Sequence, residues 1–324
     1  MKKILVSGGA GYIGSVLVRL LLEKNYFVRV IDNLSFGGEP ILDLINNENF
    51  EFIKGDIRNE TNIRKALTDI DYVAHLAAIV GDPACSCQPE LSRSINLEGS
   101  KNFYLIANEM GVERFVFSST CSNYDKMEDS DIFLTEESKL APVSLYAETK
   151  VLTEQFLLSQ PASNICKPTC LRFSTVYGLS QRPRFDLTVN EFTKELALGR
   201  ELIVFGEQFW RPYCHVADLA RGVLAVLEAS PDIVAFNVFN VGDTSENYQK
   251  LMIVEEIVKV LPDSKVSYVK KNEDPRDYKV SFEKIKEQLN FNITRRVPDG
   301  IKQIIQVIND GFLTNPDDKK YGNI

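Results

Sequence analysis

A short apolar segment that leads directly into closely spaced glycines constrains the fold of this chain more than any other feature. Lys3–Ser7 predicts a strand, the sequence GGAGYIG follows at residues 8–14, and a helical pattern comes next. Gly8 permits a tight turn, Gly11 lets backbone approach a pyrophosphate, and Gly14 lets helix and strand pack closely. The chain is therefore expected to open with a strand–turn–helix unit that binds a dinucleotide.

Strand-length apolar segments alternate with helical patterns through the first half of the chain. This alternation is typical of βαβ units, so we expect an α/β fold, a Rossmann doubly wound parallel sheet with a smaller C-terminal α/β substrate-binding lobe. The expected strands are Lys3–Ser7, Phe27–Asp32, Phe50–Lys54, Tyr72–Leu76, Arg114–Ser118 and Thr169–Phe173. The expected helices are Ile13–Glu23, Asn59–Thr68, Glu90–Met110 and Ser144–Leu158.

The regular alternation of strand and helix patterns ends after Tyr177, where a polar loop that contains proline begins. We expect a dinucleotide-binding domain over residues 1–177 to which residues 212–229 return, a second lobe over 178–313, and a frayed polar tail over 314–324. The second lobe is expected to contain three short strands, Leu202–Phe205, Phe236–Val238 and Val266–Val269.

Charge and composition exclude several classes of function. The 324 residues include 37 Lys and Arg against 45 Asp and Glu, a net charge of −8, which argues against binding to nucleic acid or to a membrane surface. No apolar run approaches the roughly 20 residues of a membrane span, and the N-terminus lacks a secretory signal, so a cytoplasmic enzyme is expected. The 6 cysteines are expected to be reduced, and with 2 histidines and no C-x-x-C pair no metal is expected.

A carboxylate at the end of the second expected strand points to the identity of the dinucleotide. Asp32 follows Gly14 by 18 residues, where its side chain can accept hydrogen bonds from a ribose diol and would repel a 2′-phosphate. We therefore expect NAD rather than NADP.

A phenol and an ammonium share one helix face near the expected ligand crevice. Tyr146 and Lys150 are four residues apart, and Ser118-Ser119-Thr120 ends the fifth expected strand. Doubly wound sheets bind their ligands at the carboxyl ends of strands. Together these side chains predict a proton-transfer site.

With these motifs in order, the chain resembles the extended short-chain dehydrogenase/reductase family, in its NAD-dependent nucleotide-sugar epimerase/dehydratase branch. The resemblance covers roughly residues 1–310. Its carriers are the glycine loop, Asp32, GDIR at 55–58, HLAA at 75–78, SST at 118–120, Tyr146 with Lys150, and RPYCHVAD at 211–218.

The resemblance implies which residues hold NAD and which perform the chemistry. Lys150 should lower the pKa of Tyr146, Tyr146 should act as general base on a sugar hydroxyl, and Thr120 should hold that hydroxyl. The expected cofactor-binding residues are Gly8, Gly11, Tyr12, Ile13, Gly14, Asp32, Asn33, Asp56, Ile57, Leu76, Ala77, Ala78, Asn96, Ser118, Tyr146, Lys150, Phe173 and Val176.

The resemblance also places a nucleotide-diphospho-sugar in the second lobe. The residues Asn190, Arg211 and Arg276 occupy positions at which the family contacts the diphosphate and the nucleotide. The planar guanidinium of arginine suits phosphate oxygens. Arg182 and Arg184 are further candidates that would guard the sugar pocket. We also expect a homodimer.

The residues after Thr120 discriminate among the reactions of the branch. The 4,6-dehydratases carry an Asp-Glu pair there, whereas this chain has Cys121-Ser122, and the glutamate of the decarboxylases is also absent. We expect oxidation at the sugar 4-position, with a 4-epimerase as the first interpretation. The alternative is a 4-dehydrogenase that releases a 4-keto sugar, because the segments 78–85 and 179–190 resemble a bacterial subgroup that handles surface-polysaccharide sugars.

Two further interpretations are less favoured. Cys121 lies in a Ser-Ser-x-Cys setting in which 3,5-epimerases of the family use a cysteine as acid or base, although a small core residue is the simpler interpretation. A non-catalytic dinucleotide sensor would keep the glycine loop, but such proteins usually lose the Tyr/Lys pair. The presence of Tyr146 and Lys150 favours an enzyme.

Overall fold

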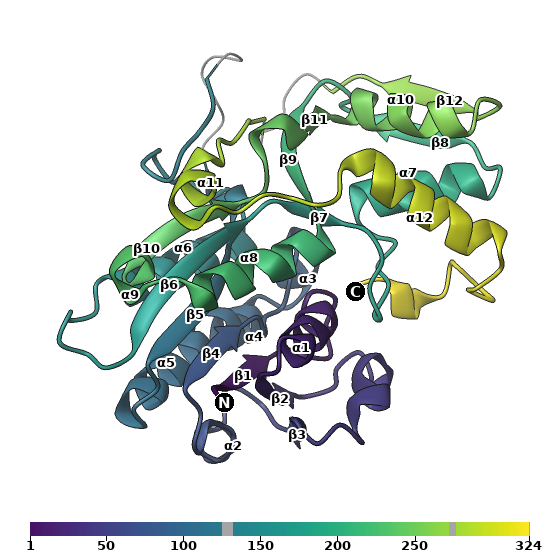
Figure 1. The fold of residues 1–324 in the computed structure, drawn as a ribbon. Coiled ribbons are helices and arrows are strands. Elements are labelled where there is room, and N and C mark those ends of the chain that lie inside the picture. The colour runs from purple at the N-terminus through teal and green to yellow at the C-terminus, as the bar shows by residue number, and fades with distance from the viewer. Residues whose placement is uncertain (125–131, 272–276, 324) are drawn as a thin grey trace.

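A parallel seven-stranded sheet forms the centre of the protein (Figure 1). The computed structural model describes residues 1–124, 132–271 and 277–323. The strand order is β10-β6-β5-β4-β1-β2-β3. The strands are β1 (Lys3–Ser7), β2 (Phe27–Asp32), β3 (Phe50–Lys54), β4 (Tyr72–His75), β5 (Arg114–Thr120), β6 (Lys167–Phe173) and β10 (Asn237–Val241).

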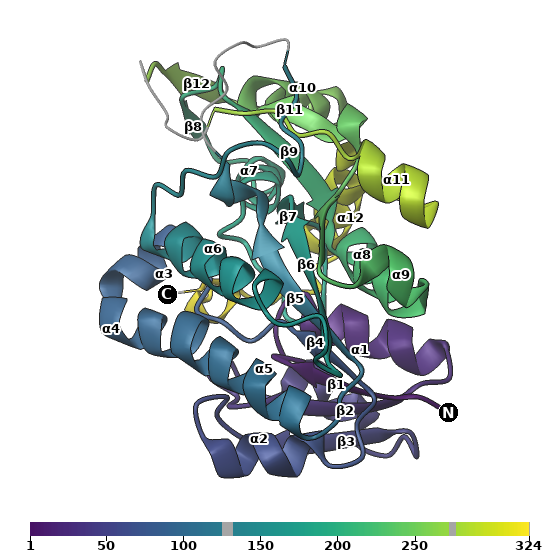
Figure 2. The same ribbon diagram turned by 90° about the vertical axis from the view of Figure 1, so that its left-hand side faces the viewer.

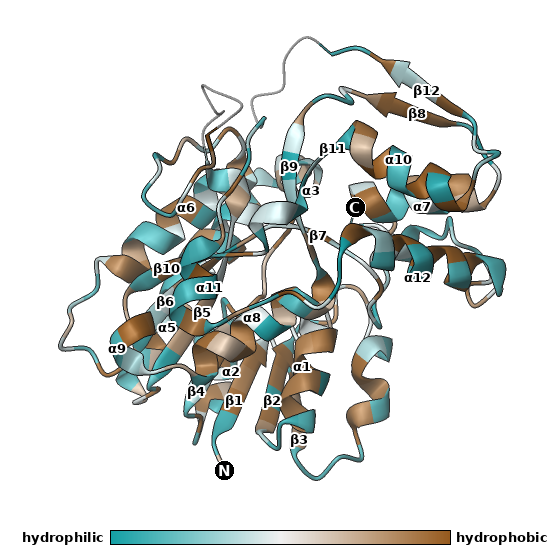
Figure 3. Ribbon diagram, turned by 45° about the horizontal axis from the view of Figure 1, so that its top comes forward, coloured by the Kyte–Doolittle hydropathy of each residue, from teal (hydrophilic) through white to brown (hydrophobic). Residues whose placement is uncertain are grey.

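Helices cover both faces of this sheet (Figure 2), so its central strands are apolar on both sides. Alternate residues of β1 enter different cores: Ile4 and Val6 pack with α1 and α8, whereas Leu5 packs with α2 and α5. Figure 3 shows the resulting hydrophobic colour along the strands. The covering helices are α1 (Gly14–Glu23) and α8 (Val216–Glu228) on one face, and α2 (Glu60–Leu67), α5 (Ser100–Glu109) and α6 (Leu145–Leu158) on the other.

A smaller lobe is built around a separate core. Tyr177, Val189, Ile253 and Ile301 are buried in it together. Its helices are α7 (Thr188–Ala197), α10 (Lys250–Val260) and α12 (Val297–Asn309). Its strands form two small sheets, β11 (Asn247–Gln249), β9 (Trp210–His215) and β7 (Thr175–Tyr177) in one, and β12 (Val266–Val269) with β8 (Leu202–Phe205) in the other.

Short elements connect these parts. The expected helix over Glu90–Met110 is divided into α4 (Pro89–Ser92), a π-helical stretch η2 (Arg93–Gly99) and α5. π-helical turns are frequent at functional sites, and this one lies beside the candidate site described below. The others are η1 (Glu39–Leu44), α3 (Asp82–Cys87), η3 (Cys121–Asn123), α9 (Pro231–Val234), η4 (Thr244–Glu246), α11 (Glu283–Leu289) and η5 (Lys319–Tyr321).

The α/β fold expected from the sequence is confirmed, with one difference in where the chain returns to the large sheet. The sequence predicts that the strand over Phe236–Val238 belongs to the smaller lobe, but β10 pairs in parallel with β6 at the edge of the large sheet. Within the expected return segment 212–229, β9 belongs to a lobe sheet and α8 packs on the large one. A five-residue strand carries too little pattern to specify its sheet.

Candidate active site

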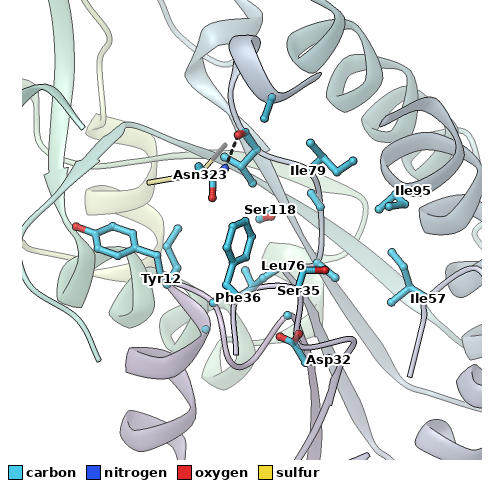
Figure 4. A pocket seen from close by; sticks show the side chains of 18 of the residues that line it. Tyr12, Asp32, Ser35, Phe36, Ile57, Leu76, Ile79, Ile95, Ser118 and Asn323 are labelled. Atoms are coloured by element: carbon cyan, nitrogen blue, oxygen red, sulfur yellow. Dashed lines mark hydrogen bonds between the residues drawn. The ribbon is translucent and has the colours of Figure 1, made fainter. Parts of the chain in front are cut away.

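One cavity of about 430 Å³ collects most of the residues singled out from the sequence (Figure 4). It lies at the carboxyl ends of β1, β2, β4 and β5, where doubly wound sheets bind ligands. The predicted residues that line it are Gly8, Gly11, Tyr12, Ile13, Gly14, Asp32, Asn33, Asp56, Ile57, Leu76, Ala77, Ala78, Ser118, Thr120, Tyr146, Lys150, Phe173, Val176 and Arg182.

The glycine loop has the backbone geometry that its spacing predicts. Gly8 has φ of +75°, a conformation that other residues rarely adopt. A Cβ on Gly14 would lie 2.1 Å from the Gly8 carbonyl oxygen, so only glycine allows this packing of α1 on the loop. No side chain of the described residues caps the first turn of α1, and that turn carries no acidic residue. Its N-terminus is therefore suited to an anionic group.

Asp32 is held in place at the end of β2. Its two carboxylate oxygens accept backbone N–H bonds from Ala10 at 3.0 Å and Leu34 at 2.8 Å. Burial raises the pKa of this carboxyl, although the backbone bonds counteract that effect. Carboxylate oxygens can accept further hydrogen bonds, so this arrangement fits the ribose of a dinucleotide.

The neighbouring acidic residue of the cavity is paired. Asp56 accepts hydrogen bonds from the Arg58 side chain, including one from Nε at 3.0 Å, and this contact lowers the pKa of Asp56. Asp56 and Ile57 therefore line the cavity with a carboxylate whose charge is partly balanced, beside an apolar side chain.

Asn96 differs from its expected role. It is buried and does not line the cavity, and its amide exchanges two hydrogen bonds with the backbone of Ile79, at 2.8 and 2.9 Å. We therefore assign Asn96 to positioning the loop after β4, whose residues do line the cavity, rather than to contact with the cofactor.

The expected catalytic residues meet at the end of β5. Ser144 caps α6 by accepting from the Ala147 N–H at 3.2 Å, and the helix presents Tyr146 and Lys150 to the cavity. The ammonium of Lys150 donates to the Ser118 carbonyl at 2.7 Å and lies 6.0 Å from the centroid of the Tyr146 ring. Thr120 completes this wall, and its hydroxyl accepts from the Ser122 N–H at 3.1 Å.

The pKa of Tyr146 is governed by burial in the protein alone. Burial raises the pKa of the Tyr146 phenol. Cys85 and Asp82 add to that shift, whereas Arg184 opposes it. Burial likewise lowers the pKa of Lys150 to about 8. Burial by itself therefore favours the neutral phenol of Tyr146.

A buried ion pair beneath this wall was not found from the sequence. Glu154 accepts from the Ser119 hydroxyl at 2.7 Å and pairs with Arg172 of β6, and both charged side chains are almost fully buried. Tyr146, Lys150 and Glu154 recur at intervals of four residues, so one helix face carries all three. That spacing was the available signal, and the pair ties α6 to the ends of β5 and β6.

Cys121 lies outside the cavity. Its buried thiol contacts the Arg172 carbonyl at 3.3 Å, and burial raises its pKa. A thiol in this position behaves as a core residue, which removes the structural basis for using Cys121 as an acid or base.

The expected substrate residues are scattered. Asn190 is buried away from the cavity, accepting from the Gly178 N–H at 2.8 Å and donating to the Arg184 carbonyl at 2.8 Å and the Tyr12 hydroxyl at 3.2 Å. These bonds occupy its amide, so we assign Asn190 to supporting the loop that carries Arg184. Arg211 does not line the cavity and stacks on Tyr278, with its Cζ 5.3 Å from the ring centroid. Arg276 lies outside the described residues.

Arg182 lines the cavity and stacks there on an aromatic ring. Its Cζ lies 3.8 Å from the centroid of Phe36, which follows Asp32 by four residues. Arg182 therefore lies near the end of β2. Phe36 and Asn323 also line the cavity and had no signal in the sequence.

The described residues offer neither a metal site nor a membrane span. No three His, Cys, Asp or Glu side chains in that part of the chain are grouped so that they could hold a metal ion. None of the described helices is long and apolar enough to cross a membrane.

Comparison with known proteins identifies the family of the chain. Residues 4–242 match the model of the NAD dependent epimerase/dehydratase family. A UDP-glucose 4-epimerase of Oryza sativa subsp. japonica is 31% identical over 265 residues, which cover 72% of this chain and 70% of that protein. A UDP-glucuronic acid decarboxylase of Arabidopsis thaliana is 26% identical over 98% of this chain and 72% of its own.

A solved structure shows the same fold with its ligands. The UDP-glucuronic acid 4-epimerase of Bacillus cereus, in complex with UDP-glucuronic acid and NAD, is 28% identical, covers 95% of this chain and 99% of its own, and has a TM-score of 0.84. NAD is the cofactor of the family, and the glycine loop and Asp32 fit it. The chain is thus an NAD-dependent enzyme and belongs to the NAD-dependent epimerase/dehydratase family.

Proposed function

We propose that the protein is a 4-epimerase of a nucleotide-diphospho-sugar. The observation that carries this proposal is that Thr120, Tyr146 and Lys150 line the same cavity as the glycine loop and Asp32. NAD, when bound, supplies the hydride acceptor of this chemistry. A sugar hydroxyl and a nicotinamide can therefore share one enclosed space.

The residues divide the proton chemistry between them. Tyr146 removes the proton of the sugar 4-hydroxyl, and Thr120 orients that hydroxyl toward the phenol. Lys150, anchored to the Ser118 carbonyl, holds the cofactor ribose and contributes positive charge. Because burial raises the pKa of Tyr146, the phenolate depends on the added positive charge of the oxidised nicotinamide.

The neighbourhood of Thr120 argues against other reactions of the family. Cys121 and Ser122 supply no acid–base pair for dehydration, and the buried Cys121 thiol does not line the cavity. Dehydration and 3,5-epimerisation thus lack their proton donors and acceptors. A non-catalytic sensor would have no use for the Tyr146 and Lys150 pair.

A 4-dehydrogenase that releases a 4-keto sugar is the second candidate, since it uses the same three residues. Val80, Ala84, Arg182 and Arg184, from the two segments that resemble a bacterial surface-polysaccharide subgroup, all line the cavity. This supports a substrate from that class of sugars for either reaction.

Incubation with a panel of UDP-, GDP-, dTDP- and CDP-sugars, followed by NMR of the products in deuterated water, tests the proposal. A 4-epimerase should invert the 4-position without incorporating solvent deuterium, because hydride leaves and returns without exchange. Release of a 4-keto sugar with stoichiometric reduced cofactor would establish the dehydrogenase instead. Deuterium at the 3- or 5-position, or a 4-keto-6-deoxy product, would contradict both.

We further propose that the enzyme is a homodimer and acts in the cytoplasm. Leu105 on α5 and Leu152 on α6 are exposed apolar side chains on adjacent helices, which supports a helical dimer interface. Light scattering of the purified protein tests the oligomeric state.

A further inference from the structure

Residues 319–323 contact two loops of the cavity wall, although the sequence predicts a frayed tail there. The Tyr321 carbonyl accepts from the Phe185 N–H at 2.8 Å, and the two rings meet edge to face with centroids 5.8 Å apart. Asn323 lines the cavity and donates to the Val80 carbonyl at 2.6 Å (Figure 4). The segment thus joins the loop after β7 to the loop after β4.

Arg182 is the charged side chain that this segment holds. Its Nη2 donates to the Gly322 carbonyl at 2.8 Å, and its guanidinium stacks on Phe36. Arg182 is 5% exposed, and its Nε is a buried donor without a hydrogen-bond partner within the described ranges. A buried donor of this kind is costly unless a ligand supplies the acceptor.

The adjacent Arg184 shows how Arg182 differs. Asp186 accepts from Arg184 through two bonds, at 2.9 and 2.6 Å, so the charge of Arg184 is balanced. Arg182 has no such carboxylate within ion-pairing distance in the part of the chain that the structure describes. Burial and the charge of Arg184 lower the pKa of Arg182 to about 10, which leaves it positive at neutral pH.

We propose that Arg182 binds the pyrophosphate of NAD. The loop after β7 carries Arg182, and residues 319–323 hold its side chain in position. Arg182, whose guanidinium forms no ion pair within the described ranges, lines the same cavity as Gly11, Tyr12 and Ile13 at the uncapped N-terminus of α1. A pyrophosphate offers oxygens that suit the guanidinium fork. The inference rests on NAD occupying this cavity and not on which sugar reaction follows.

Residues 319–323 would then act as a strap that retains the cofactor. They bind Val80 on one side and Arg182 on the other, so cofactor release requires these contacts to loosen. Slow release suits the proposed 4-epimerase, in which the reduced cofactor must stay bound until hydride returns.

Binding of NAD, ADP-ribose and adenosine to the unmodified protein and to Arg182→Met tests the contact by calorimetry. We expect NAD and ADP-ribose to bind roughly 10- to 100-fold more weakly to the variant, as for a charge-assisted hydrogen bond. Adenosine lacks the pyrophosphate and should bind equally to both proteins. Arg64→Met, which removes an exposed arginine remote from the cavity, is the matched control and should change none of these affinities.

Equal weakening of adenosine, or unchanged NAD affinity in Arg182→Met, would overturn the proposal. If that variant does not fold, Arg182→Lys keeps the charge and should still weaken ADP-ribose without affecting adenosine. Asn323→Ala leaves Arg182 intact and should accelerate the dissociation of reduced NAD severalfold in a stopped-flow fluorescence experiment. Unchanged dissociation in Asn323→Ala would show that residues 319–323 do not retain the cofactor.

Discussion

The residues expected to bind NAD and those expected to bind the nucleotide sugar differ in how accurately the sequence motifs predicted their positions. Nearly all residues expected at NAD line one cavity, and Asn96 is the exception. Of the residues expected at the nucleotide sugar outside the catalytic centre, Arg182 and Arg184 line that cavity, whereas Asn190 and Arg211 do not. Motifs at strand ends therefore locate a site more securely than motifs on loops.

The reason is geometric. In a parallel sheet all strands end at the same edge, so residues that follow β1, β2, β4 and β5 converge whatever lies between them. Asn190 and Arg211 instead lie on α7 and β9 of the smaller lobe, and their orientation depends on how the lobe packs.

Replacing Tyr146 by Phe should have the largest effect on activity, and it tests whether the residues at the strand ends form the catalytic site. Removal of the base should lower kcat by the roughly 100- to 10,000-fold typical of general acid–base catalysis. NAD affinity and the free energy of unfolding should stay nearly unchanged. Steady-state kinetics with the identified sugar, beside calorimetry of NAD binding, provide the measurement. Near-normal turnover would mean that another group is the base.

Asp32→Ala should weaken NAD binding by roughly 10- to 100-fold, because hydrogen bonds to a charged acceptor are lost. The same variant should bind NADP relatively better, since the repulsion of the 2′-phosphate is gone. Asp32→Asn is the comparison variant, because it removes the charge and keeps one acceptor oxygen, so that one of the two backbone N–H groups, of Ala10 or of Leu34, still has its partner. Equal NAD and NADP affinities in the unmodified protein would contradict the assignment of Asp32.

Asn190→Ala tests whether Asn190 supports a loop or contacts the substrate. The buried side-chain amide of Asn190 forms hydrogen bonds with the backbone of Gly178 and Arg184. Losing these bonds should lower the free energy of unfolding of the protein without nucleotide sugar by about 1–3 kcal/mol. Chemical denaturation without nucleotide sugar measures this. Unchanged stability together with a large rise in KM would instead identify a direct ligand contact.

His75 predicts a pH dependence of stability in the sheet beneath the cofactor. Burial lowers the pKa of His75 to about 3, and its ring nitrogens hydrogen-bond Ser7 at 2.7 Å and Ser100 at 2.9 Å. Below pH of about 6.5 the unfolded chain binds a proton that the folded protein does not. The free energy of unfolding should therefore fall by about 1.4 kcal/mol for each pH unit as the pH drops toward 3.

Denaturation curves at several acidic pH values, compared with those of His75→Gln, measure this slope. As the pH falls, the free energy of unfolding of the variant should decrease less steeply than that of the unmodified protein. The difference in slope should correspond to about one proton. Parallel slopes for the two proteins would show that other groups control the acid response.

Much of the fold was predictable because the local pattern and the tertiary packing agree. The expected strands Lys3–Ser7, Phe27–Asp32 and Phe50–Lys54 coincide with β1, β2 and β3. The divided helix over Glu90–Met110 was not predictable, because its apolar spacing does not distinguish a π turn from an α-helix. The buried pair of Glu154 and Arg172 joins residues from different elements, which single-segment patterns do not reveal.

By itself the sequence determined the doubly wound sheet, the glycine turn, the carboxylate at Asp32 and the shared helix face of Tyr146 and Lys150. Each of these depends on a few neighbouring residues and on the fixed periods of strands and helices. Only the tertiary structure decided that Asn96 and Asn190 support loops, and that residues 319–323 hold Arg182 on the cavity. Those roles arise from contacts between segments far apart in the chain, where burial and hydrogen-bond satisfaction, not local pattern, select the partner.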